Sequence, residues 1–195
     1  PMTLNVGVYL YPGVELLDFA GPCEVFTTAN RLPPEGAPFS VFSVAAERRP
    51  ATSRAGVVIQ PDYSFADHPP IDVLLVPGGV VDEVMNEAAV VGWIAEVSAA
   101  ARLTASVCNG AFLLAAAGVL DGRRVTTHWE DIDALRTRFP ALTVEDGPRW
   151  VDQGDVVTSA GISAGIDMSL HLVERLQSRT LAAATARQMD FHRAS

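Results

Sequence analysis

Lysine is absent from this chain. All 14 basic residues are arginines, and 23 aspartates and glutamates outnumber them, which gives a formal net charge of −9. A nucleic-acid-binding surface needs a basic patch that neutralises phosphates, and these arginines are scattered, so we predict no nucleic-acid partner. The chain also lacks a run of roughly 18 apolar residues, the length that a membrane-spanning helix needs. Its first residues, Pro1-Met2-Thr3, show no basic region with a cleavage site. We therefore expect neither a membrane partner nor a signal peptide.

Cysteine is scarce, and the common metal and phosphate motifs are missing. Cys23 and Cys108 are the only cysteines. Two cysteines without a secretory signal indicate a reducing compartment, so we expect a cytoplasmic protein. The sequence has no C-x-x-C, no H-E-x-x-H and no run of aspartates, so we predict no metal site. Because it also has no G-x-G-x-x-G and no Walker loop, we expect no cofactor.

The sequence does contain short apolar strands that alternate with helices. With 49% hydrophobic and 19% charged residues, its 195 residues suit one globular domain, 1–195. The alternation is typical of an α/β fold, in which helices cover both faces of a mostly parallel sheet. The Gln153-Gly154 turn predicts one antiparallel edge hairpin. The expected strands are 4–10, 39–45, 57–60, 71–76, 103–107, 150–152 and 156–159, and the expected helices are 22–31, 86–101, 110–117, 127–140, 164–177 and 180–189.

Cys108 is the first candidate for chemistry. It directly follows the strand 103–107, and a helix begins at Gly110 without a loop between them. So sharp a turn strains the backbone and needs small neighbours, as in a nucleophile elbow, although the motif here reads S-V-C-N-G. The start of a helix can lower the pKa of a thiol from about 8.5 to roughly 3.5–7.5. We therefore predict a thiolate nucleophile, with a cysteine that only packs beneath the helix as the alternative.

Asp18 is the second candidate, because large apolar residues flank it in the stretch 11–21. Partial desolvation should raise the pKa of its carboxyl group, so that it could exchange a proton with the thiol as a general acid and base. The alternative is that this aspartate only caps the helix that follows it.

The other candidates lie beyond the same strand ends, where α/β sheets bind ligands. Gly78 and Gly79 follow the strand 71–76, and their backbone could approach a substrate as an oxyanion hole, or simply form a turn. The backbone N–H of Asn109 could join the same hole. His128 stands near a helix start, in a Thr127–Glu130 capping box. We expect it to be neutral and to contact the site residues rather than to polarise a substrate.

Four stretches resemble the ThiJ/PfpI superfamily, which has the class I glutamine-amidotransferase-like, flavodoxin-like fold. They are Y-P-G-V-E-L-L-D-F-A-G-P-C-E-V-F (11–26), V-P-G-G (76–79), S-V-C-N-G and the following residues to T-T-H-W (106–129), and T-S-A-G-I-S-A-G-I-D (158–167). Within the superfamily, the D-x-x-G-P and T-T-H-W elements are similar to those of isonitrile hydratases and of the ligand-binding domains of AraC-type regulators. The resemblance implies that Cys108 is the nucleophile, Asp18 its acidic partner and Gly79 an oxyanion donor. It also implies a homodimer, for which the loop 11–22 is a candidate contact.

Asn109 departs from several branches of the superfamily. Protease-like and glyoxalase-like members have a histidine after the nucleophile, and isonitrile hydratases generally have a threonine. True amidotransferases have a late H-x-E pair, where this chain has Ser163-Ala164-Gly165-Ile166-Asp167. The regulators continue into a helix-turn-helix domain, whereas this chain stops at Ser195, so we expect no DNA-binding role.

Our leading hypothesis is a cysteine-dependent hydratase or lyase that acts on a small electrophile, with the hydration of an isonitrile to an N-formamide as the representative reaction. The second hypothesis is a non-enzymatic sensor, in which Cys108 binds a small molecule or is oxidised without turnover. A glyoxalase or deglycase activity is the third.

Overall fold

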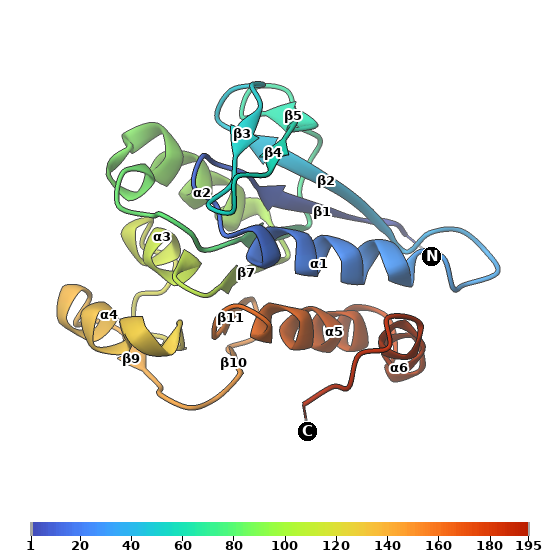
Figure 1. Cartoon of the computed structure of the whole chain (residues 1–195). Coiled ribbons are helices and arrows are strands. Elements are labelled where there is room, and N and C mark those ends of the chain that lie inside the picture. The colour runs from blue at the N-terminus through green and yellow to red at the C-terminus, as the bar shows by residue number, and fades with distance from the viewer. Residues whose placement is uncertain (1, 195) are drawn as a thin grey trace.

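A mostly parallel sheet forms the centre of the computed structural model, which describes residues 2–194 (Figure 1). Its strands are β1 (Leu4–Tyr9), β2 (Phe39–Ala45), β5 (Tyr63–Ser64), β6 (Val73–Val76), β7 (Leu103–Val107), β10 (Trp150–Asp152) and β11 (Val156–Ser159). They are ordered β10-β11-β7-β6-β1-β2-β5, and only β10 and β11 pair antiparallel. The predicted α/β fold and its edge hairpin are therefore confirmed.

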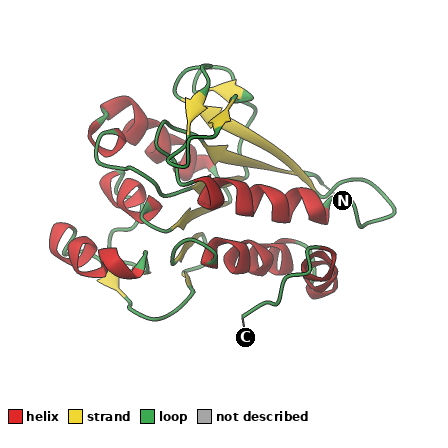
Figure 2. Cartoon of the chain, viewed as in Figure 1, coloured by secondary structure: helices red, strands yellow, loops and turns green. Residues whose placement is uncertain are grey.

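Helices cover both faces of this sheet (Figure 2). They are α1 (Leu16–Ala29), α2 (Ala88–Ala100), α3 (Gly110–Ala116), α4 (Ile132–Arg138), α5 (Ala164–Leu176) and α6 (Arg179–Gln188). Successive side chains of a strand point to opposite faces, and β6 shows the result. Val73 and Leu75 pack into one core with α1, α5 and α6, whereas Leu74 and Val76 pack into the other with α2, α3 and α4. Among residues 2–194, no helix is long and apolar enough to cross a membrane.

Two small sheets stand outside the main one. The expected strand 57–60 is β4 (Val58–Ile59), which pairs with β3 (Ala51–Thr52) in an antiparallel ribbon rather than with the central sheet. In the second small sheet, β8 (Arg124–Val125) pairs with β9 (Thr143–Val144). We predicted no strand at β3, β5, β8 or β9, because two-residue strands carry too little periodicity to be recognised.

The predicted start of the first helix is wrong. We placed it at Pro22, because proline suits a first helical turn. The helix instead begins at Leu16, with Glu15 as its N-cap residue, and Pro22 lies inside it. This shift places Asp18 in the first turn of α1 rather than in a loop.

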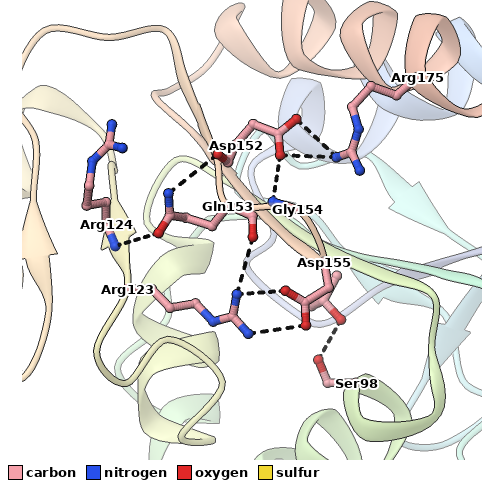
Figure 3. A network of polar contacts seen from close by, with 9 residues as sticks. Ser98, Arg123, Arg124, Asp152, Gln153, Gly154, Asp155 and Arg175 are labelled. Atoms are coloured by element: carbon pink, nitrogen blue, oxygen red, sulfur yellow. Dashed lines mark hydrogen bonds and ion pairs between the residues drawn. The ribbon is translucent and has the colours of Figure 1, made fainter.

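Hydrogen bonds and ion pairs connect the edge hairpin, β10 and β11, to neighbouring segments (Figure 3). Arg123 binds both carboxylate oxygens of Asp155, at 2.7 and 3.2 Å. Asp152 accepts hydrogen bonds from Arg175 of α5 and from the Gly154 N–H. These contacts link β10 and β11 to α5 and to the segment before β8. Strand β11 and helix α5 flank the loop 160–163, which reaches the site described next.

Candidate active site

Cys108 adopts a left-handed backbone conformation, with a φ of 57°. This conformation is strained for a residue other than glycine, and it turns the chain from β7 into α3 without a loop. Gly110 makes the turn possible, because a Cβ atom there would collide with the carbonyl oxygen of Val76. The predicted elbow geometry at the carboxyl edge of a strand is therefore present. The cysteine side chain is almost buried, with 8% of the residue exposed.

Backbone contacts bring the three expected loops together beside this elbow. Val14 and Gly79 form an isolated antiparallel bridge between the loop after β1 and the turn after β6. The side chain of Asn109 joins the elbow to the same turn. Its Oδ1 accepts the Gly79 N–H at 2.8 Å, and its Nδ2 donates to the Gly79 carbonyl at 2.9 Å.

This amide pair corrects the expected role of Gly79. We expected its N–H to be free for a developing negative charge, but the Asn109 side chain already accepts it. The neighbouring Gly78 allows a close approach instead. A Cβ atom on Gly78 would lie 2.8 Å from Asp18 Oδ2 and 2.9 Å from the Asn109 backbone nitrogen. Gly78 is thus the residue that lets the carboxylate and the elbow come close.

Asp18 is fully buried, and neither of its carboxylate oxygens has a hydrogen-bond partner of normal geometry among the described residues. Burial, followed by the charge of Glu15, raises the pKa of Asp18 to about 7. The Gly78 backbone and the Cys108 thiol act in the opposite direction, although they offset only part of the shift. The predicted upward shift is therefore confirmed. The N-cap residue of α1 is Glu15, so the alternative of a capping role for Asp18 is wrong.

The thiol itself differs from our expectation. Burial, with the charge of Asp18 as the next cause, raises the pKa of Cys108 above its usual range. The Asn109 backbone N–H lowers it by less. We predicted a lowered pKa from the start of α3, and that prediction is wrong because desolvation outweighs the contribution of this short helix. Within this pair the sulfur therefore holds a proton more tightly than the Asp18 carboxylate does.

The predicted capping box at Thr127 is also wrong, and its correction places His128 at the site. The Thr127 hydroxyl donates to the Cys108 carbonyl at 2.9 Å instead of capping a helix. The N-cap residue is His128, whose Nδ1 accepts the Glu130 N–H at 3.2 Å, ahead of a single 3-10 turn and α4. The ring lines the same pocket as the thiol rather than standing behind it.

Gly161 contacts the candidate site, although we did not predict it as a site residue. A Cβ atom on this residue would lie 2.7 Å from Cys108 Sγ and would also collide with the His128 ring. The loop 160–163 reaches the elbow because β11, which precedes it, pairs in parallel with β7. Such a contact depends on strand order, which local sequence does not specify.

A cavity of about 490 Å³ opens beside the thiol. Its wall includes Gly79, Asn109, His128 and Ile162, together with the charged residues Glu15, Arg54, Glu130 and Asp131. Another cavity, of about 280 Å³, is lined by Thr104 and Val156 at the amino ends of β7 and β11 and contains none of the predicted site residues. The site is therefore at the carboxyl edge of the sheet, where the strand order reverses around β1.

Comparison with known proteins agrees with this fold. Residues 5–175 match the DJ-1/PfpI family, and the chain belongs to it. An isonitrile hydratase of Pseudomonas putida is 37% identical over 191 residues, which cover 97% of this chain and 79% of that protein. The HTH-type transcriptional regulator CdhR of Pseudomonas aeruginosa is 31% identical over 193 residues, and the match covers 96% of this chain but only 55% of the regulator.

Solved structures show the same fold. A ThiJ/PfpI family protein from Pseudomonas syringae superposes with a TM-score of 0.88 at 30% identity, over 100% of this chain and 77% of that one. Drosophila melanogaster DJ-1beta gives a TM-score of 0.83 at 21% identity, over 98% and 100% of the two chains. Because DJ-1beta is only 21% identical, its similarity supports the fold alone.

Proposed function

We propose that this protein is a cysteine-dependent hydratase that adds water to an isonitrile or a similar small electrophile. The observation that carries the proposal is a strained Cys108 that lines the cavity, next to a fully buried Asp18 whose carboxylate has no hydrogen-bond partner of normal geometry among the described residues. The 37% identity to an isonitrile hydratase supports the choice of electrophile.

The first half-reaction forms a thioimidate. Asp18 accepts the thiol proton while the sulfur of Cys108 attacks the terminal carbon of the isonitrile. Asp18 then returns that proton to the same carbon, so that a C–S and a C–H bond have formed and the carboxylate is restored. A carboxyl group with a pKa of about 7 suits both halves of this transfer near neutral pH.

The second half-reaction releases an N-formamide. Asp18 removes a proton from water, whose oxygen attacks the thioimidate carbon, and the proton moves to nitrogen. The C–S bond then breaks as the C=O bond forms, and the hydroxyl proton returns to the Asp18–Cys108 pair. In this scheme the Asn109 backbone N–H supports the sulfur, and the Gly79 N–H takes part only if the Asn109 side chain releases it.

The test is formamide production from benzyl isonitrile, followed by NMR. We expect N-benzylformamide from the wild type and from Cys23→Ser, and none above background from Cys108→Ser. Asp18→Asn should lower kcat by a factor of about 10²–10⁴, the usual contribution of a general acid–base group. The proposal fails if reduced protein forms no formamide from a set of alkyl and aryl isonitriles.

A sensor is the second candidate function, and the match to CdhR favours it. In that case Cys108 would bind or be oxidised without turnover. Mass spectrometry after mild peroxide treatment should then show the addition of one or two oxygen atoms at Cys108 and none in Cys108→Ser. Steady formamide release over many turnovers would argue against a purely sensory role.

We also propose a homodimer that uses the segment 11–22. Leu17 in this segment is 41% exposed, although it is a large apolar side chain. Sedimentation equilibrium should give about twice the mass of the chain, and Leu17→Asp should weaken the association. A monomer at all concentrations would exclude this arrangement.

A further inference from the structure

The pocket beside Cys108 carries an excess of negative charge. Its wall contains three carboxylates, from Glu15, Glu130 and Asp131, and one guanidinium group, from Arg54. The guanidinium group faces Glu15 at 3.8 Å. The single positive charge is therefore already opposed by a carboxylate, which leaves Glu130 and Asp131 to be balanced by something else.

His128 does not supply that balance. Its Nδ1 lies 4.0 Å from Glu130 Oε1 and 3.9 Å from Asp131 Oδ2. The same nitrogen accepts the Glu130 backbone N–H at 3.2 Å, and at these distances the imidazole forms no hydrogen bond with either carboxylate. The two carboxylates thus remain uncompensated by the side chain nearest to them.

A second cavity, of about 390 Å³, adjoins the one beside the thiol, and its wall charges can be compared with those described above. It shares Arg54 and Asp131 with the first cavity, and the charged residues that it adds, Asp82 and Arg138, are opposite in sign, so it adds no net charge. The negative excess is therefore confined to the part of the site that holds the thiol. The charges of Asp131 and Glu15 also reach the sulfur, since both contribute to the raised pKa of Cys108.

We propose that this pocket selects positively charged electrophiles, such as small molecules that carry an ammonium or quaternary amine, over anionic ones. The identity of the electrophile rests on the proposed function, whereas the preference for its charge rests on the wall residues. A cleft lined by one sign of charge raises the local concentration of the opposite sign by a factor of about 10 or more. The cationic group would lie against Glu130 and Asp131 while the reactive carbon meets Sγ.

The test measures the charge preference of Cys108 without any turnover. In a Cys23→Ser background, the thiol is modified by trimethylammonium-ethyl methanethiosulfonate (cationic) or sulfonatoethyl methanethiosulfonate (anionic) at pH 9 and low salt. In each case a protein–reagent S–S bond forms and methanesulfinate leaves. Each rate is divided by the rate for 2-mercaptoethanol under the same conditions, which removes the intrinsic reactivity of the reagent.

We expect the normalised rate for the cation to exceed that for the anion by about tenfold or more. The ratio should fall at least threefold in Glu130→Gln/Asp131→Asn and also in 0.5 M salt, where exposed charges are screened. Asp133→Asn is the matched control. This carboxylate follows closely in the sequence, but its side chain is 97% exposed and does not line the pocket, so the ratio should not change.

Three results would overturn the charge preference. They are a ratio of one or less, a ratio that the double variant leaves unchanged, and a thiol that reacts with neutral methyl methanethiosulfonate but with neither charged reagent.

Other results separate the charge preference from the proposed function. A thiol that reacts with none of the three reagents would overturn both. Selective labelling without formamide from any isonitrile would overturn the proposed function alone. Equal turnover of ammonium-bearing and carboxylate-bearing isonitriles would overturn the charge preference alone.

Discussion

Gly161 lies directly against the thiol of Cys108, although we did not select it from the sequence. A Cβ atom there would stand 2.7 Å from Cys108 Sγ, which is closer than side-chain atoms pack. We predict that Gly161→Ala lowers the rate of Cys108 modification by methyl methanethiosulfonate at least tenfold. Overpacking should also reduce the free energy of unfolding by about 1–3 kcal/mol. Thiol-labelling kinetics and urea denaturation measure the two effects.

Gly92→Ala is the matched control for this substitution. Gly92 lies in α2, and a Cβ atom there would meet nothing within 4 Å. The same added methyl group should leave thiol labelling unchanged and should stabilise the helix by about 0.5–1 kcal/mol. A Gly161→Ala protein that labels at the wild-type rate would show that the loop 160–163 moves freely away from sulfur.

Residue roles could be predicted where they follow from local surroundings. The elbow at Cys108 follows from a strand that meets a helix without a loop, and the raised pKa of Asp18 follows from its apolar neighbours. The thiol pKa, the Asn109–Gly79 amide pair and the contact of Gly161 with sulfur could not be predicted. Each of these depends on segments that the sheet brings together from distant parts of the chain.

At the scale of elements, the buried strands and long helices were predicted, and the errors lie at helix starts and at the two-residue strands. Pro22 and the Thr127–Glu130 pair both match rules for the first turn of a helix, yet neither marks one here. In each case a tertiary contact decides the boundary. The Glu15 N–H donates a hydrogen bond to the Gly78 carbonyl and fixes the start of α1. The Thr127 hydroxyl donates to the Cys108 carbonyl and therefore does not cap a helix.

Helix α5 is held to the sheet by an ion pair that we expect to be essential for stability. Asp167 in its first turn is 3% exposed in its side chain, and its Oδ2 accepts a hydrogen bond from Arg149 Nε at 2.7 Å. Removing one partner of such a pair leaves a buried charge without its counterion. We predict that Arg149→Met lowers the free energy of unfolding by about 3 kcal/mol, measured by urea denaturation.

An exposed arginine of similar chemistry is the control for this ion pair. Arg179 contacts Glu174 at 3.2 Å, but its side chain is 87% exposed. Arg179→Met should therefore cost less than about 1 kcal/mol, as is usual for surface pairs. Equal costs for the two variants would mean that Asp167 is rehydrated when Arg149 is removed.

At the scale of the whole molecule, the proposed site lowers stability. The fold keeps a carboxyl group fully buried with no hydrogen-bond partner of normal geometry, beside a thiol on strained backbone. An apolar replacement would suit the core better, so the arrangement is consistent with selection for reactivity rather than for packing.

The pH dependence of unfolding should reveal this cost. Folded Asp18 binds its proton more tightly than the unfolded chain does, because its pKa is about 7 rather than 3.8. The folded state therefore holds an extra proton between about pH 4 and pH 7, and the free energy of unfolding falls as the pH rises through this window. A shift of about three pKa units corresponds to about 4 kcal/mol.

In Asp18→Asn this decline should disappear, while the other groups that titrate in this window do so as before. The difference in unfolding free energy between wild type and variant, from urea titrations at pH 4.5 and pH 8, should therefore change by about 3 kcal/mol in favour of the variant at the higher pH, since part of the full effect lies below pH 4.5. Parallel stability curves for the two proteins would mean that folding does not raise the pKa of Asp18, and its carboxylate would then be too weak a base to take the thiol proton in the proposed reaction.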